Sequence, residues 1–128
     1  MINSYSNKYI LVGHTDVVFC LKKLSSTQVA SAGADSRIII WNWVDGTLVF
    51  ILNGHTNVLY LSSLELFDEQ TLISGSWDQT VKFWNITNGT LIRSMNVDIQ
   101  IDALAMLKIS KAKFLLLCKL FYYNLFLF

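Results

Sequence analysis

The chain is short of charge and contains no proline. Charged residues make up 15% of its 128 residues, against about 25% in a typical soluble domain, whereas hydrophobic residues make up 53%. A chain with so little charge has few side chains to place in solvent, so we infer that its elements are buried on more than one side. Its length suits one domain, since domains commonly have ~100–150 residues.

Cysteine is scarce as well, because the sequence contains only Cys20 and Cys118. Two cysteines so far apart provide no disulfide framework, and neither belongs to a CxxC pair, so a reducing compartment is the simpler interpretation. The first 16 residues hold a single lysine and no long apolar segment of the kind that a secretory signal requires. We therefore expect a cytoplasmic or nuclear protein.

Several ligand classes lack their sequence signals. The net charge of +1 offers no clustered basic face, so we expect no nucleic-acid partner. The six glycines never form GxxxxGK or GxGxxG, and the two histidines and two cysteines lack the spacing of a zinc site. The sequence therefore predicts no metal, no cofactor and no small-molecule substrate.

What the sequence does contain is a repeat of about 43 residues. SAGADSRIIIWN at 31–42 returns as SGSWDQTVKFWN at 74–85, and GHTDVV at 13–18 returns as GHTNVL at 54–59. The Ser, Asp and Trp positions recur after 43 residues, but Gly-His recurs after 41. The second copy thus has two extra residues between its His and its Ser. We place them where LSSTQ aligns loosely with LELFDEQ, because insertions are tolerated in surface turns.

Each copy divides into four short strand-like segments separated by turn signals, which is the pattern of an antiparallel sheet. Asp45-Gly46 and Asn88-Gly89 join the third and fourth segments, and these dipeptides favour tight hairpin turns. Near-continuous apolar segments such as RIIIW indicate strands buried on both faces, as in a stack of sheets. The expected strands are 17–22, 27–33, 37–43 and 47–52 in the first copy, and 58–64, 70–76, 80–86 and 90–95 in the second.

These residues resemble the WD-repeat β-propeller family. The resemblance rests on Gly-His, then Ser-x-x-x-Asp, then a Trp six residues after the Asp, at a period within the ~40–45 residues of that family's blade. Trp-Asn replaces the family's Trp-Asp in both copies. The resemblance implies an all-β fold of four-stranded antiparallel blades in an incomplete ring. It places an outer strand of a preceding blade within 1–12 (NKYILV, 7–12) and blades at 13–53 and 54–96.

The resemblance also implies a hydrogen-bonded tetrad of His, Ser, Asp and Trp in each blade. The residue types suit one another, because a carboxylate accepts, an indole donates, and a hydroxyl does both. Ser, His and Asp also compose a hydrolase triad, but neither a GxSxG elbow nor an oxyanion loop accompanies them, so we expect no enzyme. The expected tetrads are His14, Ser31, Asp35 and Trp41 in the first blade, and His55, Ser74, Asp78 and Trp84 in the second.

Three loop residues are candidates for binding a partner protein. Asp16, Asn57 and Trp77 belong to the loops of the face on which members of the family often bind other proteins. The first copy has Ala34 at the position of Trp77, so the tetrad does not require a tryptophan there, and exposed tryptophan is enriched at interface hot spots. Packing of Trp77 against a neighbouring blade is the alternative. The resemblance thus implies a non-catalytic scaffold or adaptor in a multiprotein complex.

The repeat degenerates in residues 97–128. The segment 96–107 follows the register of 53–64, but every tetrad position is replaced, and only 111–118 is expected as a further strand. Residues 114–128 could be a membrane anchor, although they are fewer than the ~20 required and Lys119 and Asn124 interrupt them.

The interpretation that we favour is a partial third blade in a fragment of a longer propeller. Since at least three repeats are needed to bury a continuous core, we also expect exposed sheet edges and self-association.

Overall fold

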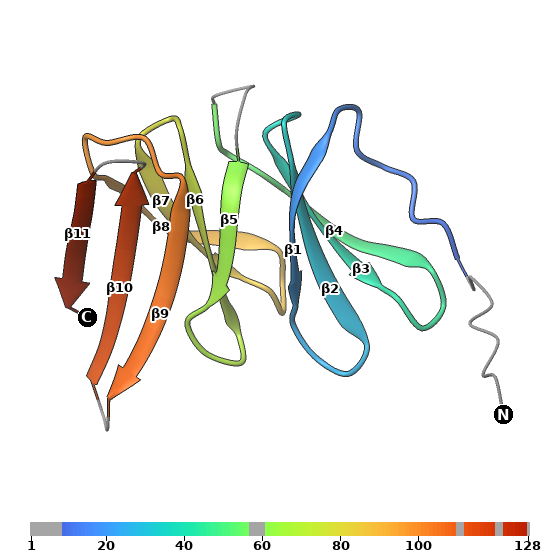
Figure 1. Ribbon diagram of the computed structural model, residues 1–128. Coiled ribbons are helices and arrows are strands. Elements are labelled where there is room, and N and C mark those ends of the chain that lie inside the picture. The colour runs from blue at the N-terminus through green and yellow to red at the C-terminus, as the bar shows by residue number, and fades with distance from the viewer. Residues whose placement is uncertain (1–8, 57–60, 110–111, 120–121, 128) are drawn as a thin grey trace, which may run out of the picture.

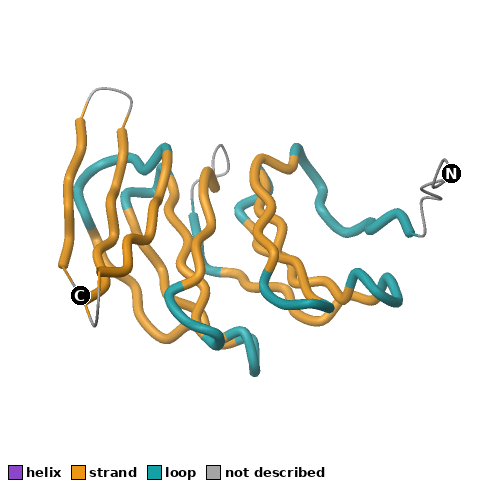
Figure 2. Tube along the Cα trace, turned by 60° about the horizontal axis from the view of Figure 1, so that its bottom comes forward, coloured by secondary structure: helices purple, strands orange, loops and turns teal. Residues whose placement is uncertain are grey.

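The fold consists of three antiparallel sheets that stand side by side in chain order (Figure 1). The computed structural model describes residues 9–56, 61–109, 112–119 and 122–127, and these residues contain strands and no helix (Figure 2). The all-β prediction is confirmed. The sheets are β1 (Val18–Lys23), β2 (Gln28–Gly33), β3 (Arg37–Asn42) and β4 (Thr47–Asn53), then β5 (Leu61–Leu66), β6 (Thr71–Ser76), β7 (Thr80–Asn85) and β8 (Thr90–Asn96), then β9 (Ala103–Ile109), β10 (Ala112–Lys119) and β11 (Tyr122–Leu127).

Each sheet is an up-and-down arrangement in which every strand pairs with its neighbours in the sequence. The first strand of each sheet also contacts the first strand of the next, so β1, β5 and β9 lie in a row. Figure 1 shows the row open at both ends, with the N-terminal sheet on one side and β9–β11 on the other. These are propeller blades in an open array.

In the turns between the third and fourth strands, the glycine of each expected dipeptide has a positive φ, whereas the preceding Asp45 or Asn88 does not. Gly46 and Gly89 have φ of 79° and 74°, the left-handed conformation that glycine adopts without steric cost. The turns between the second and third strands place Ser36 and Gln79 at φ of 62° and 67°. Turn type and strand spacing therefore agree between the two copies.

Two hydrophobic clusters hold the sheets together, one on each side of the second sheet. The first cluster joins the first two sheets and includes Ala30, Ile40 and Trp84, all at most 1% exposed. The second cluster joins the second and third sheets and includes Phe83 and Leu115. Phe83 and Trp84 are consecutive residues of β7, and since neighbouring side chains of a strand point to opposite faces, the second sheet is buried on both sides.

The extra residues of the second copy do not lie where the sequence alignment places them. The Leu24 N–H donates to the Gln28 carbonyl, and the Phe67 N–H donates to the Thr71 carbonyl, so the two turns have the same length. The insertion precedes β5 instead. The alignment was wrong because it compared apolar residues in the sequence. In the structure, the pairing between neighbouring strands determines which residues of the two copies are equivalent.

Residues 9–12 are described without regular secondary structure, so the outer strand expected at 7–12 is not formed there. A β-strand needs a hydrogen-bonded neighbour, and no described strand pairs with this segment. Residues 7 and 8 lie outside the described part of the chain.

The C-terminal residues form two strands, of which the sequence predicted one. β10 corresponds to the expected strand at 111–118, and β11 pairs with it from Phe114 opposite Leu127 to Lys119 opposite Tyr122. The sequence left open a membrane anchor at 114–128. Within the described residues, no helix is long and apolar enough to cross a membrane.

Candidate functional site

The four tetrad residues of the first blade lie in one chain of hydrogen bonds. Trp41 Nε1 donates to Ser31 Oγ over 2.8 Å, and the same oxygen lies 2.7 Å from His14 Nε2. On the other side of the ring, His14 Nδ1 lies 2.9 Å from Asp35 Oδ2. The residues come from β2, β3 and the two loops at the same end of the sheet, and the pairing of β2 with β3 sets their spacing.

The second blade repeats this arrangement. Trp84 Nε1 donates to Ser74 Oγ over 2.8 Å, and His55 lies between Ser74 and Asp78, with both distances 2.7 Å. The side chains of His55 and Asp78 are 1% and 5% exposed, and Ser74 is fully buried. The structure thus brings together all eight sequence-predicted tetrad residues, four in each blade.

Donor and acceptor chemistry determines which atom carries the proton in each hydrogen bond of the tetrad. The indole can only donate and an ionised carboxylate can only accept, so Ser74 Oγ accepts from Trp84 and Asp78 accepts from His55 Nδ1. In a neutral imidazole the remaining His55 Nε2 accepts the hydroxyl proton of Ser74. Each proton is then used once, which is the condition under which burying such a network is tolerable.

The two aspartates also hold the loop that carries the histidine. Asp35 accepts from the backbone N–H of Thr15, and Asp78 accepts from the backbone N–H of Thr56, at 3.0 and 3.1 Å. The residue two positions after each aspartate adds a further contact. Arg37 forms an ion pair with Asp35 at 2.8 Å, and Thr80 Oγ1 donates to Asp78 at 2.6 Å.

Sequence reasoning missed Arg37 and Thr80. Their signal was their common position two residues after the aspartate, because side chains near a turn often bond to a carboxylate within it.

Hydrogen bonding keeps the aspartates ionised. Burial alone would raise the pKa of Asp78, but the bonds from His55, Thr80 and the Thr56 backbone outweigh it and hold the pKa of this carboxyl well below its usual range. For Asp35, burial also opposes ionisation, and the N–H groups of Thr15 and Arg37 with the His14 ring lower its pKa.

The hydrogen bonds join Asp78, His55 and Ser74 in the order of a hydrolase triad, but a substrate cannot reach the serine. The carboxylate lies at Nδ1 and the hydroxyl at Nε2, as a general base would require. Ser74, however, is 0% exposed, lies within β6 and receives the indole N–H of Trp84. No carbonyl of a substrate can approach this oxygen without opening the sheet.

The partner-binding candidates have different surroundings. Asp16 is exposed, and its Oδ1 accepts from the backbone N–H of Val17 at 2.7 Å. Trp77 is half-buried, and its Nε1 donates to Asp102 Oδ1 at 2.8 Å, so it contacts the segment that leads into the third sheet. Asn57 lies outside the described residues.

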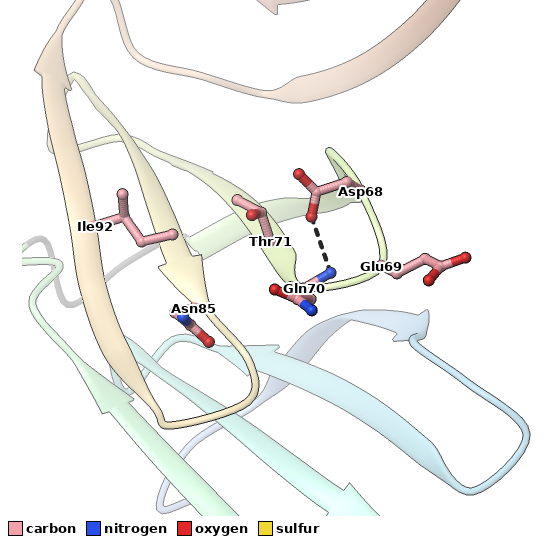
Figure 3. Close-up of a pocket in the computed structure, with 6 residues that line it drawn as sticks. All are labelled: Asp68, Glu69, Gln70, Thr71, Asn85 and Ile92. Carbon is pink, nitrogen blue, oxygen red and sulfur yellow. Dashed lines mark hydrogen bonds between the residues drawn. The ribbon is translucent and has the colours of Figure 1, made fainter.

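A shallow pocket of about 490 Å³ lies at the other end of the second sheet, by the turn between β5 and β6 (Figure 3). The side chains that line it in Figure 3 are polar apart from one, and Asp68 Oδ1 accepts from the Gln70 backbone. No group of three metal-ligating side chains occurs in the described parts of the chain. The lining residues are Asp68, Glu69, Gln70, Thr71, Asn85 and Ile92.

Known proteins share both the repeat and the fold. WD repeat-containing protein 41 of Homo sapiens is 35% identical over 85 residues, which cover 62% of this chain and 18% of that protein. F-box/WD repeat-containing protein sel-10 of Caenorhabditis elegans is 35% identical over 86 residues, which cover 67% of this chain and 14% of that protein. The chain therefore spans a small part of the length of these relatives.

Solved structures with similar folds include two computationally designed proteins. Ika4 superposes with a TM-score of 0.70 at 29% identity, covering 84% of this chain and 64% of that one. Ika8 superposes with a TM-score of 0.67 at 24% identity, covering 82% and 31%. Residues 5–42 and 46–85 each match the repeat of the family described as "WD domain, G-beta repeat". The two matches to the family's repeat together cover more than half of the chain, so the chain belongs to the WD40-repeat family.

Proposed function

We propose that this chain is a non-catalytic scaffold module that binds other proteins through the loops at the tetrad end of its blades. The observation that supports the proposal is the hydrogen bonding of Ser74, His55 and Asp78. They are buried and bonded to one another and to Trp84, so they stabilise the blade and are not available to a substrate.

The tetrads also make the adjoining loops suitable for recognition. The backbone N–H groups of Thr15 and Thr56 are bound to the tetrad aspartates, so each loop is attached to its sheet just after the histidine. A loop held in this way loses little conformational freedom when a partner binds, which favours affinity. Asp16 is exposed at this end, and Asn57 is expected there. We propose a cytoplasmic or nuclear location.

Site-specific photo-crosslinking tests this proposal. A photoreactive amino acid is introduced at Asp16 or at Thr56, and in the control at Glu69, which lies by the pocket at the other end of the second sheet. In the native cell we expect covalent adducts with other proteins from the first two positions and not from the third. Adducts from Glu69 alone would contradict the assignment of the binding face.

A serine-directed fluorophosphonate probe tests the non-catalytic part of the proposal. We expect no labelling of the folded protein, because Ser74 and Ser31 are inaccessible within their sheets. Labelling that disappears in Ser74→Ala, in a variant that keeps its folded circular dichroism spectrum, would overturn it and favour the hydrolase alternative.

A further inference from the structure

In the described part of the chain, one apolar face of the first sheet lacks the cover that the same face of the second sheet has. Leu21 pairs with Ser31, and Leu64 pairs with Ser74, so the two leucines occupy equivalent positions in β1 and β5. Leu64 is 3% exposed because the first sheet packs against it, whereas Leu21 is 69% exposed. A sheet that packed on the first one as the first packs on the second would bury Leu21.

Residues 9–12 already occupy the place of an outer strand from such a preceding sheet. In the described blades, Phe50 of β4 packs on Gly89 in the hairpin of the next sheet, 2.6 Å from where a Cβ would be. Tyr9 packs in the same way on Gly46, at 2.8 Å. Tyr9 precedes His14 by the same number of residues as Phe50 precedes His55. Residues 9–12 are therefore positioned as 50–53 of β4 are, but none of the described strands pairs with residues 10–12.

The third sheet, at the other end of the row, has one described strand fewer than the first two sheets. The first two sheets have four strands each, whereas β9–β11 form three, and among the described residues β11 pairs only with β10. An unpaired edge exposes a row of N–H and C=O groups that another strand can bind.

We propose that the chain assembles head to tail with a second copy of itself. Residues 9–12 of one copy add to β11 of the other as its fourth strand, and that completed sheet covers Leu21. One neighbour satisfies both contacts, because in the described blades the sheet that provides Phe50 is also the sheet that buries Leu64. Two copies joined in this way contain six sheets, within the ~4–8 blades of propellers, and the heterologous contact can close as a ring.

The repeat gives the register of the added strand. In the first sheet Ser31 pairs with Ile39, and Ile39 pairs with Ile51. Leu117 is at the position of Ser31 by the 43-residue spacing, and it pairs with Asn124. Since Ile10 is the equivalent of Ile51, we expect Ile10 of one copy to lie opposite Asn124 of the other.

Native mass spectrometry and light scattering on the purified chain test the assembly. We expect twice the mass of the 14.6 kDa chain. In the double variant Ile10→Pro, Leu11→Pro we expect the monomer mass, because proline removes the N–H groups that the added strand needs. Residues 10 and 11 lie outside the sheets, so the circular dichroism spectrum should stay the same. A monomeric unmodified chain, or a dimer that survives both prolines, would overturn the proposal.

Disulfide trapping tests the register independently of the proline variant. Ile10→Cys and Asn124→Cys are made as separate proteins and mixed under mild oxidation, since directly opposed residues of an antiparallel pair are close enough for a disulfide. We expect a covalent dimer in the mixture and not in either protein alone, which also controls for Cys20 and Cys118. A mixture of Ile10→Cys with Glu69→Cys should give none, and equal trapping in both mixtures would contradict the assembly.

Discussion

Lys22 and Glu65 occupy the same position in successive blades, and their side chains form an ion pair, with Lys22 Nζ 2.8 Å from Glu65 Oε2. Lys22 pairs with Ala30 in the first sheet, and Glu65 pairs with Ile73 in the second. The pair therefore joins β1 to β5 across the junction between the blades. Its side chains are 31% and 25% exposed, so solvent and salt screen the attraction.

We expect this pair to contribute little to the free energy of unfolding. A double-mutant cycle of Lys22→Ala and Glu65→Ala should give a coupling energy below about 1 kcal/mol, as for other partly exposed pairs, and less in about 1 M salt. The apolar cluster behind it would then provide most of the adhesion between the blades. A coupling of several kcal/mol, insensitive to salt, would show that the ion pair is a main contact of the junction.

Removal of the central hydroxyl of a tetrad should be far more costly. Ser74→Ala leaves the indole N–H of Trp84 and Nε2 of His55 without their partner in a buried site. Each buried polar group without a partner costs ~1–3 kcal/mol, and chemical denaturation should show a loss of that size or more.

Thr56→Ala is the matched control for this measurement. Thr56 is exposed beside the same tetrad and donates its backbone N–H to Asp78, a bond that the substitution keeps. We expect a change within about 0.5 kcal/mol, as for other surface substitutions. Equal losses in the two variants would mean that the hydrogen bonds of Ser74 do not stabilise the blade.

Acid should weaken the second blade through Asp78. The pKa of this carboxyl is lower in the folded protein than in the unfolded chain, where it is about 3.9. The stabilisation is therefore complete above that value and is lost as the pH falls towards the folded pKa. Denaturation of the wild type and of Asp78→Asn at several pH values should show a gap in stability that is constant near neutrality and narrows below about pH 4. A gap that does not change with pH would contradict this role of the charge.

Local and repeated features were predictable from the sequence. The glycines at 46 and 89 specify their turns by backbone conformation alone, and the residues of a tetrad recur at fixed spacing because the blade geometry recurs. The eight tetrad residues could therefore be named before their distances were known.

Features that depend on a non-local partner were not predictable. β11 has neither a tetrad aspartate nor a turn signal, and it forms by pairing with β10. Residues 10–12 have the apolar character of a strand but pair with no strand in the described part of the chain, so they remain irregular. The sequence alone does not distinguish partner binding from packing for Trp77, because its contact, Asp102, belongs to a segment in which the repeat has degenerated.

The contact of Phe50 with Gly89 allows a direct test of how the hairpins position successive blades. Gly89 has φ of 74°, and a Cβ there would lie 2.6 Å from Phe50 Cδ1. Gly89→Ala should destabilise the protein by about 1–2 kcal/mol through the left-handed backbone, with a further loss from displacement of the ring. Gly89→Asn should recover part of the backbone cost, because asparagine tolerates this conformation better than alanine.

Phe50→Ala separates the two causes. If the ring and the added methyl group compete for the same space, the double variant Phe50→Ala, Gly89→Ala should lose less free energy of unfolding than the sum of the single variants. Strict additivity would place the whole effect of Gly89→Ala in the backbone. The outer strand of one blade would then not constrain the hairpin of the next, and the parallel contact of Tyr9 with Gly46 would lose its value as a marker of a preceding sheet.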